Sequence, residues 1–221
     1  MDNLVVLNNE KISEKNKKFF FRNFNFKILP EGLNKFFNVQ YIARKSKIDE
    51  HHEINLQNVT IASNIFEFIY HLISTFKNKN TKYYIITITP YTFLAFLFLF
   101  LFRKKIFVYL ISSGYEEWKF ILGSWSIWIY HIMYSIVTSG ATVIALHERL
   151  LKQKNGYVIE SSALTDEWLK NIKKPNLDKV RFLNVSRVNP EKGIFEFLEM
   201  FKELNIAAEI SIVGKIKNLT L

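Results

Sequence analysis

The chain has 221 residues, of which 49% are hydrophobic and 23% are charged, so its composition is that of a globular protein and not of a disordered one. It contains no cysteine, which excludes disulfides, thiolate zinc sites and cysteine nucleophiles. The formal net charge is +10, which favours anionic partners, although a chain that is rich in Lys, Asn, Ile and Phe throughout explains the excess equally well.

The N-terminal part gives the first elements. Its only apolar run covers four residues behind Asp2, which is too short for a secretory signal peptide, so we expect a cytoplasmic protein. The pattern then predicts a short strand over 24–29, a short helix over 31–37, a strand over 38–45 and an amphipathic helix over 64–78. Residues 49–53, DEHHE, contain metal-ligating types but no spaced pair, so we predict an exposed loop there and no metal site.

An uncharged segment from Ile85 to Phe102 has two interpretations. Its length and the basic residues that follow it fit a transmembrane helix, and the protein would then be a single-span, membrane-anchored, non-enzymatic one. Divided at Pro90, the same segment is a strand over 82–89 that leads into a helix over 91–102. Buried parallel strands and their crossovers are also apolar, so hydropathy alone does not separate these readings.

The remaining pattern alternates strands and helices. We predict a strand over 104–114, one or two aromatic helices over 118–140, a strand followed by a helix over 142–153, and a strand over 156–161. Such alternation favours an α/β fold with right-handed crossovers, here a Rossmann-like domain over residues 1–175. Pro175, in a polar stretch, marks the boundary, and residues 176–221 then predict the first βαβ unit of a second, incomplete Rossmann-like domain.

Two cations lie in the turn of that second βαβ unit. Arg187 follows the strand over 180–186, and Lys192 and Gly193 precede the helix over 194–205. Ligands of open α/β sheets bind beyond the carboxyl ends of the strands, where a helix N-terminus and a glycine admit an anion. The pattern therefore indicates a phosphate-like ligand; in the alternative, Lys192 is solvated and Arg187 pairs with Glu191.

The same residues carry a family resemblance. The stretch FLNVSRVNPEKGIFEFLEMFKEL, followed by ISIVG, resembles the start of the C-terminal domain in GT-B-fold glycosyltransferases of the family 4, or group 1, type. In that family a strand ends in Gly-Arg before a Glu-Lys-Gly sequence and an amphipathic helix; here Ser186 replaces the glycine. Residues 131–164 resemble the end of the family's N-terminal domain.

The resemblance implies an activity. Arg187 and Lys192 would be the catalytic residues, and with Gly193 they would hold the diphosphate of a nucleoside-diphosphate-sugar donor. Fixed cations there stabilise the charge that develops on the leaving diphosphate. The sugar, of hexose type, would pass with retention to a glycan or lipid-linked acceptor in cell-envelope polysaccharide synthesis, without cofactor or metal. The family's pair of glutamates eight residues apart would lie beyond Leu221, so a truncated, inactive glycosyltransferase is the other alternative.

The first domain should supply the acceptor side. Gly114, Glu116 and Glu117 follow the strand at 106–111 and face the predicted cleft, and His147 follows a later strand. A solvated helix start is the alternative for the two glutamates, which point in different directions because they are adjacent.

The net positive charge also makes membranes and nucleic acids possible partners. Trp118, Trp125 and Trp128 follow a basic stretch, a pairing that is typical of peripheral contact with an anionic membrane, here its inner face. Core packing explains these tryptophans equally well. The other aromatic residues lie in apolar runs, so we expect no nucleic-acid partner.

Overall fold

The computed structural model describes residues 1–78, 80–152, 154–159, 170–172, 174, 180–186, 188, 193–204 and 208–214. The chain divides into two compact units, Met1–Ala163 and Leu164–Leu221. Both contain parallel strands joined by helices, so the predicted α/β fold class is confirmed. The domain boundary predicted near Pro175 lies outside the described residues.

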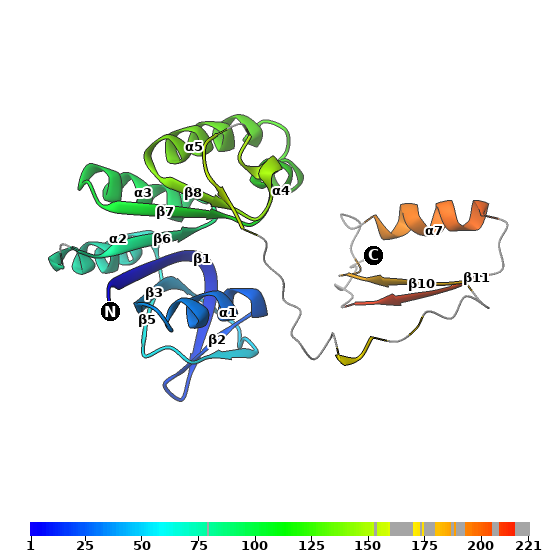
Figure 1. The fold of residues 1–221 in the computed structure, drawn as a ribbon, viewed down its shortest axis with the longest axis horizontal. Coiled ribbons are helices and arrows are strands. Elements are labelled where there is room, and N and C mark those ends of the chain that lie inside the picture. The colour runs from blue at the N-terminus through cyan, green and yellow to red at the C-terminus, as the bar shows by residue number, and fades with distance from the viewer. Residues whose placement is uncertain are drawn as a thin grey trace. The chain divides into compact units, whose positions relative to one another are not determined.

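A parallel sheet forms the centre of the first unit (Figure 1). Its strands lie in the order β5-β3-β1-β6-β7-β8-β9. The chain runs from β1 outward to β3 and β5 and then crosses to β6, so the strand order reverses between β1 and β6. The strands are β1 (Asn3–Lys15), β3 (Asn38–Lys45), β5 (Asn58–Ala62), β6 (Lys82–Ile86), β7 (Lys105–Leu110), β8 (Thr142–Ala145) and β9 (Tyr157–Val158).

Strand β1 continues past the parallel sheet into an antiparallel edge. Its register shifts between Leu7 and Lys11, and its last residues pair with β2 (Lys18–Phe21), which pairs with β4 (His52–Ile54). The exposed loop predicted at 49–53 is therefore wrong in part, because His52 lies in β4 and Glu50 is buried. The Ser46 hydroxyl donates a hydrogen bond to the Glu50 carboxylate at 2.9 Å.

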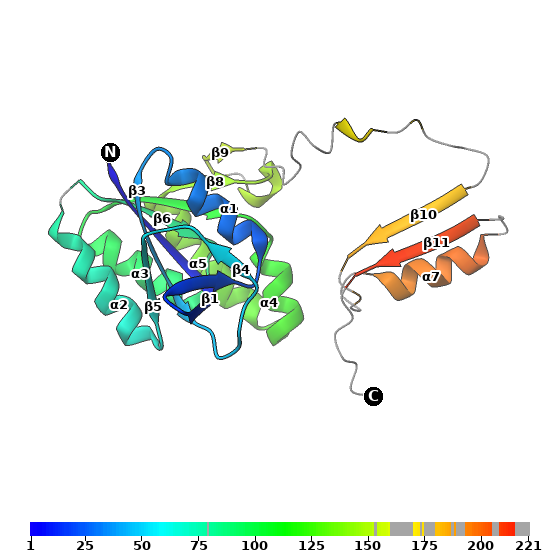
Figure 2. The same cartoon turned by 90° about the horizontal axis from the view of Figure 1, so that it is seen from below.

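Helices cover both faces of the sheet. One face is covered by α2 (Ile65–Ser74), α3 (Pro90–Leu101) and α5 (Ser126–Gly140); α3 and α5 lie above β7 and β8 in Figure 1. The other face carries α1 (Phe24–Leu33), which the turned view in Figure 2 separates from α2. The strand predicted over 24–29 is wrong, because Phe26, Leu29 and Leu33 contact the core with helical spacing.

The central strands are buried on both sides. Val5 and Leu7 of β1 pack with Phe68 and Phe96 under α2 and α3, whereas Leu4 and Val6 pack on the opposite face. A parallel strand between two helical layers requires this continuous apolar sequence. The same requirement explains the apolar segment at 85–102, which divides into the end of β6 and the helix α3.

The division occurs at Pro90, as predicted. Pro90 is the first residue of α3, and Thr89 caps the helix: the backbone N–H of Thr92 donates to the Thr89 hydroxyl at 3.3 Å, and the N–H of Thr89 donates to the Thr92 hydroxyl at 2.8 Å. Among the residues that the structure describes, no helix has both the length and the apolar character needed to cross a bilayer.

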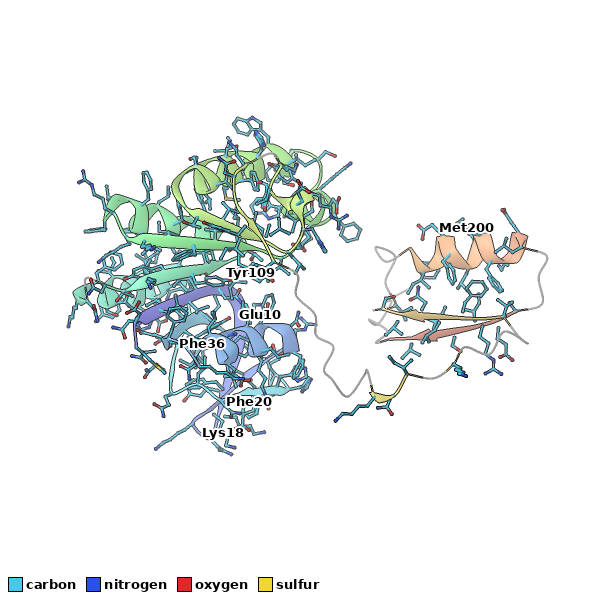
Figure 3. The ribbon with its side chains drawn as sticks, in the orientation of Figure 1. Glu10, Lys18, Phe20, Phe36, Tyr109 and Met200 are labelled. Carbon is cyan, nitrogen blue, oxygen red and sulfur yellow. The ribbon has the colours of Figure 1, made fainter. Side chains whose placement is uncertain are left out.

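The second unit contains a βαβ element. β10 (Val180–Val185) and β11 (Ala208–Val213) pair in parallel, and α7 (Ile194–Glu203) connects them, close to the predicted bounds. The Phe182 ring packs edge-on against Phe201, with ring centroids 5.5 Å apart, and Ile194 is buried. Met200 points away from the strands, as Figure 3 shows.

Candidate functional site

A cavity of about 240 Å³ lies beyond the carboxyl ends of β7 and β8. This is the edge at which open parallel sheets bind their ligands. Three elements besides the strand ends supply its wall: α4 (Gly114–Leu122), α5 and the short helix η2 (Glu148–Leu150). The lining residues are Leu110, Ser112, Ser113, Gly114, Tyr115, Glu116, Tyr130, Tyr134, Arg149, Leu150 and Lys152.

Gly114 is required by the ring of Tyr130. A Cβ atom at position 114 would lie 2.2 Å from Tyr130 Cζ and 2.3 Å from its hydroxyl oxygen, which no real side chain permits. Tyr130 is only 3% exposed, and no hydrogen-bond partner of its hydroxyl is found among the described residues. Since no fully buried polar atom of the described side chains lacks a partner, the hydroxyl must reach the cavity. It is therefore free to bond a ligand.

Three other polar groups fix the surrounding wall. The Tyr134 hydroxyl donates to the backbone carbonyls of Leu150 and Leu151, at 2.8 and 2.6 Å, and so ties η2 to α5. The Tyr115 hydroxyl lies 2.9 Å from His131 Nδ1. The Lys152 ammonium lies over the Tyr115 ring, 3.1 Å from its centroid, a cation–π contact.

Burial raises the pKa values of two tyrosines that line the cavity. It raises the pKa of Tyr134 to about 12, with a smaller contribution from Tyr115, and it raises the pKa of Tyr130 further. The Tyr134 proton is used in the bonds to Leu150 and Leu151, whereas the Tyr130 hydroxyl can donate its proton to a ligand. A buried neutral hydroxyl beside aromatic rings suits a ligand that carries both hydroxyl groups and C–H faces, as a sugar does.

The charges of the wall are mixed, with cations in excess. Glu116 supplies one carboxylate, and Arg149 and Lys152 supply two cations. Arg149 and Lys152 also border an open depression of about 480 Å³ with Glu148 and Lys154. The arrangement can bind an anionic group on one side while a carboxylate accepts a hydrogen bond from a hydroxyl on the other.

A smaller cavity of about 40 Å³ adjoins the first, since both share Leu110, Ser112, Gly114 and Tyr130. Its other lining residues are Thr87, Ile88, Thr89, Glu117 and Trp118. Thr87, at φ +59°, holds a backbone conformation that β-branched residues rarely adopt, and Lys152 in the larger cavity has φ +45°. Strained backbone of this kind gathers at functional sites.

The predicted acceptor-side residues lie around these cavities but not all in one place. Gly114 and Glu116 line the larger cavity and Glu117 the smaller one, so the adjacent glutamates do point in different directions. His147 is exposed, precedes η2, and is not among the described residues that line either cavity. Their proposed contacts with an acceptor stay predictions.

Sequence reasoning missed the other lining residues. Tyr130 and Tyr134 lie in an apolar helix and read as core, although their spacing of four residues places them on one face. Arg149 and Lys152 fall in the segment over 142–153 that was predicted as a strand followed by a helix, and no role was assigned to them. The short length of η2 brings both side chains to the cavity, and the sequence carried no signal for it.

The predicted donor residues Arg187 and Lys192 lie outside the described residues. Gly193 is described: it has φ +66°, precedes the first residue of α7, and has only Glu196 Oε2, at 4.0 Å, near the position of a Cβ. Among the described residues, no side chain caps the start of α7. The first N–H groups of a helix have no partner within the helix itself. Ser186 hydrogen-bonds Asn184 Oδ1 at 2.8 Å at the end of β10.

The comparisons with known proteins leave the family open. No protein-family model and no curated protein matches the sequence. Among solved structures, the chain is similar to one named as a UDP-N-acetylglucosamine 2-epimerase from Listeria monocytogenes, at 12% identity and a TM-score of 0.49, over 99% of this chain and 64% of that one. A UDP-GlcNAc 2-epimerase from Methanocaldococcus jannaschii gives 13% identity and a TM-score of 0.44, over 98% and 74%.

Such remote matches assign neither a family nor an activity to this chain. The chain spans 64% of the length of the Listeria monocytogenes structure.

Proposed function

We propose that the protein is a nucleotide-sugar enzyme of glycan synthesis, and specifically a glycosyltransferase of GT-B type. The carrying observation is the βαβ element of the second unit, in which β10 ends at Val185 and α7 begins at Ile194, directly after Gly193. The left-handed Gly193 and the absence of a side-chain cap on α7 among the described residues support this proposal, because the N–H groups of a helix start bind anions. The resemblance of residues 182–204 to GT-B glycosyltransferases assigns Arg187 and Lys192 as the cations that would bind the donor diphosphate.

The proposed reaction is the transfer of the sugar to an acceptor hydroxyl with retention at the anomeric carbon, so the acceptor oxygen arrives on the face that the diphosphate leaves. The acceptor hydroxyl oxygen forms a bond to the anomeric carbon, the bond from that carbon to the diphosphate oxygen breaks, and the hydroxyl proton leaves with the nucleoside diphosphate. Two fixed cations stabilise the leaving diphosphate more than the bound donor, which lowers the barrier. Neither a metal nor a cofactor is part of this proposal.

The cavity of the first unit is the proposed acceptor site. Its Tyr130 hydroxyl and Glu116 carboxylate can hydrogen-bond sugar hydroxyls, while Arg149 and Lys152 favour an acceptor with an anionic group. A glycan or a lipid-linked phosphate has this chemistry.

Calorimetric titration with uridine, guanosine and adenosine diphosphate tests the donor site. We expect one of the three to bind the wild type, and Arg187→Ala with Lys192→Ala to weaken that binding at least about 100-fold, as the loss of two charge-assisted contacts requires. The matched control is Arg181→Ala with Lys202→Ala, which removes the same charge from the start of β10 and the last turn of α7. Equal binding by all three proteins would refute the assignment.

A further inference from the structure

In the first unit, α3 and α5 cover one face of the sheet, and the sides of these helices that face the solvent are apolar. A helix that packs on a sheet normally carries charged residues on its solvent side. Helices α3 and α5 contain no Asp, Glu, Lys or Arg. Their solvent-facing sides still expose large apolar residues, among them Leu101, which is 74% exposed, and Trp128, which is 69% exposed. Isolated apolar residues on a surface need no explanation, whereas a continuous group marks an interaction site.

The exposed residues belong to one layer. On α5, Trp128, Ile132 and Ile136 are exposed at a spacing of four residues, so they form a stripe along one side of the helix. On α3 the corresponding side exposes Leu94, Leu97 and Leu101. The two helices lie side by side in Figure 1, above β7 and β8.

A close contact joins these two stripes. The rings of Phe96 and Phe100 on α3 lie 2.9 Å from the position that a Cβ of Gly140, on α5, would occupy. Gly140 therefore lets the helices approach, and Phe100, which stays 57% exposed, adds to the surface beside the α5 stripe.

The turn between α4 and α5 extends the group. Phe120, Ile121 and Leu122 at the end of α4 are exposed, and so is Trp125, the residue before α5. With the two stripes they form what we call the apolar face of α3, α4 and α5. Since α5 alone has 15 residues, the face is about 22 Å long.

Cations border this face. Arg103 follows the exposed C-terminal end of α3, and Lys119 directly precedes Phe120 on α4; both side chains are exposed. Lys104 lies at the same end of α3, with its ammonium 4.8 Å from the centroid of the Phe76 ring. Helix α4 also carries the exposed carboxylates Glu116 and Glu117, one turn before Phe120 and Ile121. Two uncharged helices with exposed leucines and tryptophan, and Lys or Arg at their margin, form the pattern of a surface that lies in the plane of an anionic bilayer.

From these observations we infer that the apolar face of α3, α4 and α5 docks onto a lipid bilayer with anionic headgroups. The contact would be peripheral, because no described helix crosses a membrane. The net charge of +10 supplies long-range attraction, and the tryptophans and leucines would enter the boundary between headgroups and acyl chains by roughly 5–10 Å. This inference is independent of the proposed transfer reaction, since none of its residues supplies the sugar or diphosphate contacts.

Vesicle co-sedimentation of the full chain tests the inference. The probes are vesicles of phosphatidylglycerol with phosphatidylcholine, and vesicles of phosphatidylcholine alone. We expect strong binding to the first and weak binding to the second, because each cation near an anionic surface changes affinity about fivefold. Trp125→Ser with Trp128→Ser should lower binding to the anionic vesicles at least about tenfold.

Two matched controls isolate the face. Phe36→Ser removes an aromatic residue that is 72% exposed, next to α1 and β3 (Figure 3), and should leave binding unchanged. Arg103→Gln with Lys119→Gln should lower affinity on the order of twentyfold. Lys35→Gln with Lys47→Gln, which removes the same charge from other exposed positions, should lower it far less.

Three outcomes would overturn the inference. The chain could fail to bind anionic vesicles; the Phe36 variant could lose as much binding as the double tryptophan variant; or the wild type could sediment as a dimer without lipid that the tryptophan substitutions dissociate. The last result would show that a second copy of the chain covers the face. Circular dichroism must show that each variant is folded, which the exposure of the replaced side chains favours.

Discussion

Replacing Gly114 by alanine should destabilise the first unit and close the cavity. The new Cβ would lie 2.2 Å from Tyr130 Cζ, and contacts under 3.0 Å do not occur, so the ring must move by at least 0.8 Å, the difference between these distances. The ring has little room, because it packs against Tyr115 at 4.7 Å and Trp118 at 5.6 Å between centroids. Overpacking of this kind costs about 1–3 kcal/mol.

A smaller term acts in the opposite direction. Gly114 is the first residue of α4, and alanine is preferred over glycine in helices by up to about 1 kcal/mol. The net expectation is a loss of about 1–2 kcal/mol in the free energy of unfolding, which lowers Tm by roughly 2–8 °C for a unit of this size. Thermal unfolding followed by tryptophan fluorescence measures it, since Trp118, Trp125 and Trp128 lie on α4 and around the start of α5.

Two further variants test whether the contact between position 114 and the Tyr130 ring causes this loss. Gly32→Ala on α1 places its Cβ where no atom lies within 4 Å, so it should be neutral or slightly stabilising. Tyr130→Leu removes the ring atoms that clash, and in this background Gly114→Ala should cost nothing. If Gly114→Ala were as well tolerated as Gly32→Ala in the wild-type background, the packing described for the cavity would be wrong.

Two other predictions concern stability. Tyr134→Phe leaves the carbonyls of Leu150 and Leu151 without their hydroxyl donor and should cost about 1–3 kcal/mol in chemical denaturation, whereas Tyr157→Phe, at an exposed ring, should cost almost nothing. Burial, and then the Glu50 carboxylate, raise the pKa of Glu10, so this group penalises folding once the pH rises above its unfolded pKa near 4.5, and the full penalty is present above its folded pKa. Glu10→Gln should therefore stabilise the protein at pH 7 and leave its stability at pH 4 nearly unchanged; an equal effect at both pH values would contradict the assigned environment.

Much of the fold follows from local sequence signals. Pro90 separates β6 from α3 because its ring fits the first turn of a helix and its missing N–H would break a strand. The same kind of signal located α7, whose apolar residues recur with helical spacing, and β11 after it.

Other elements depended on tertiary contacts. β1 carries polar residues at Asn8 to Glu10, where its register shifts, so no continuous strand pattern was visible. The Asn8 amide donates a hydrogen bond to the buried Tyr41 hydroxyl at 2.8 Å, a contact across 33 residues of sequence. Helix α1 contains Pro30 and no acidic residue in its first turn, so the usual start signals were missing.

The cavity was predictable only on the side that follows β7, at Gly114 and Glu116. Gly114 and the residues after β7 could be located because parallel strands present their carboxyl ends to ligands. Tyr130 could not, because a tyrosine on an apolar helix looks the same whether its hydroxyl meets the core or a cavity. The core and cavity positions of the Tyr130 hydroxyl are separated only in the structure, where the ring packs against Gly114.

The transfer reaction itself is the most direct test of the proposed function. The chain would be incubated with labelled uridine, guanosine and adenosine diphosphate sugars and a lipid extract that contains phosphate-linked acceptors, and the products would be separated. We expect release of a nucleoside diphosphate with the label on the acceptor, and loss of both when Arg187 and Lys192 are both replaced by alanine. Conversion of the sugar nucleotide into an isomer, with its diphosphate bond intact and no labelled acceptor, would contradict it.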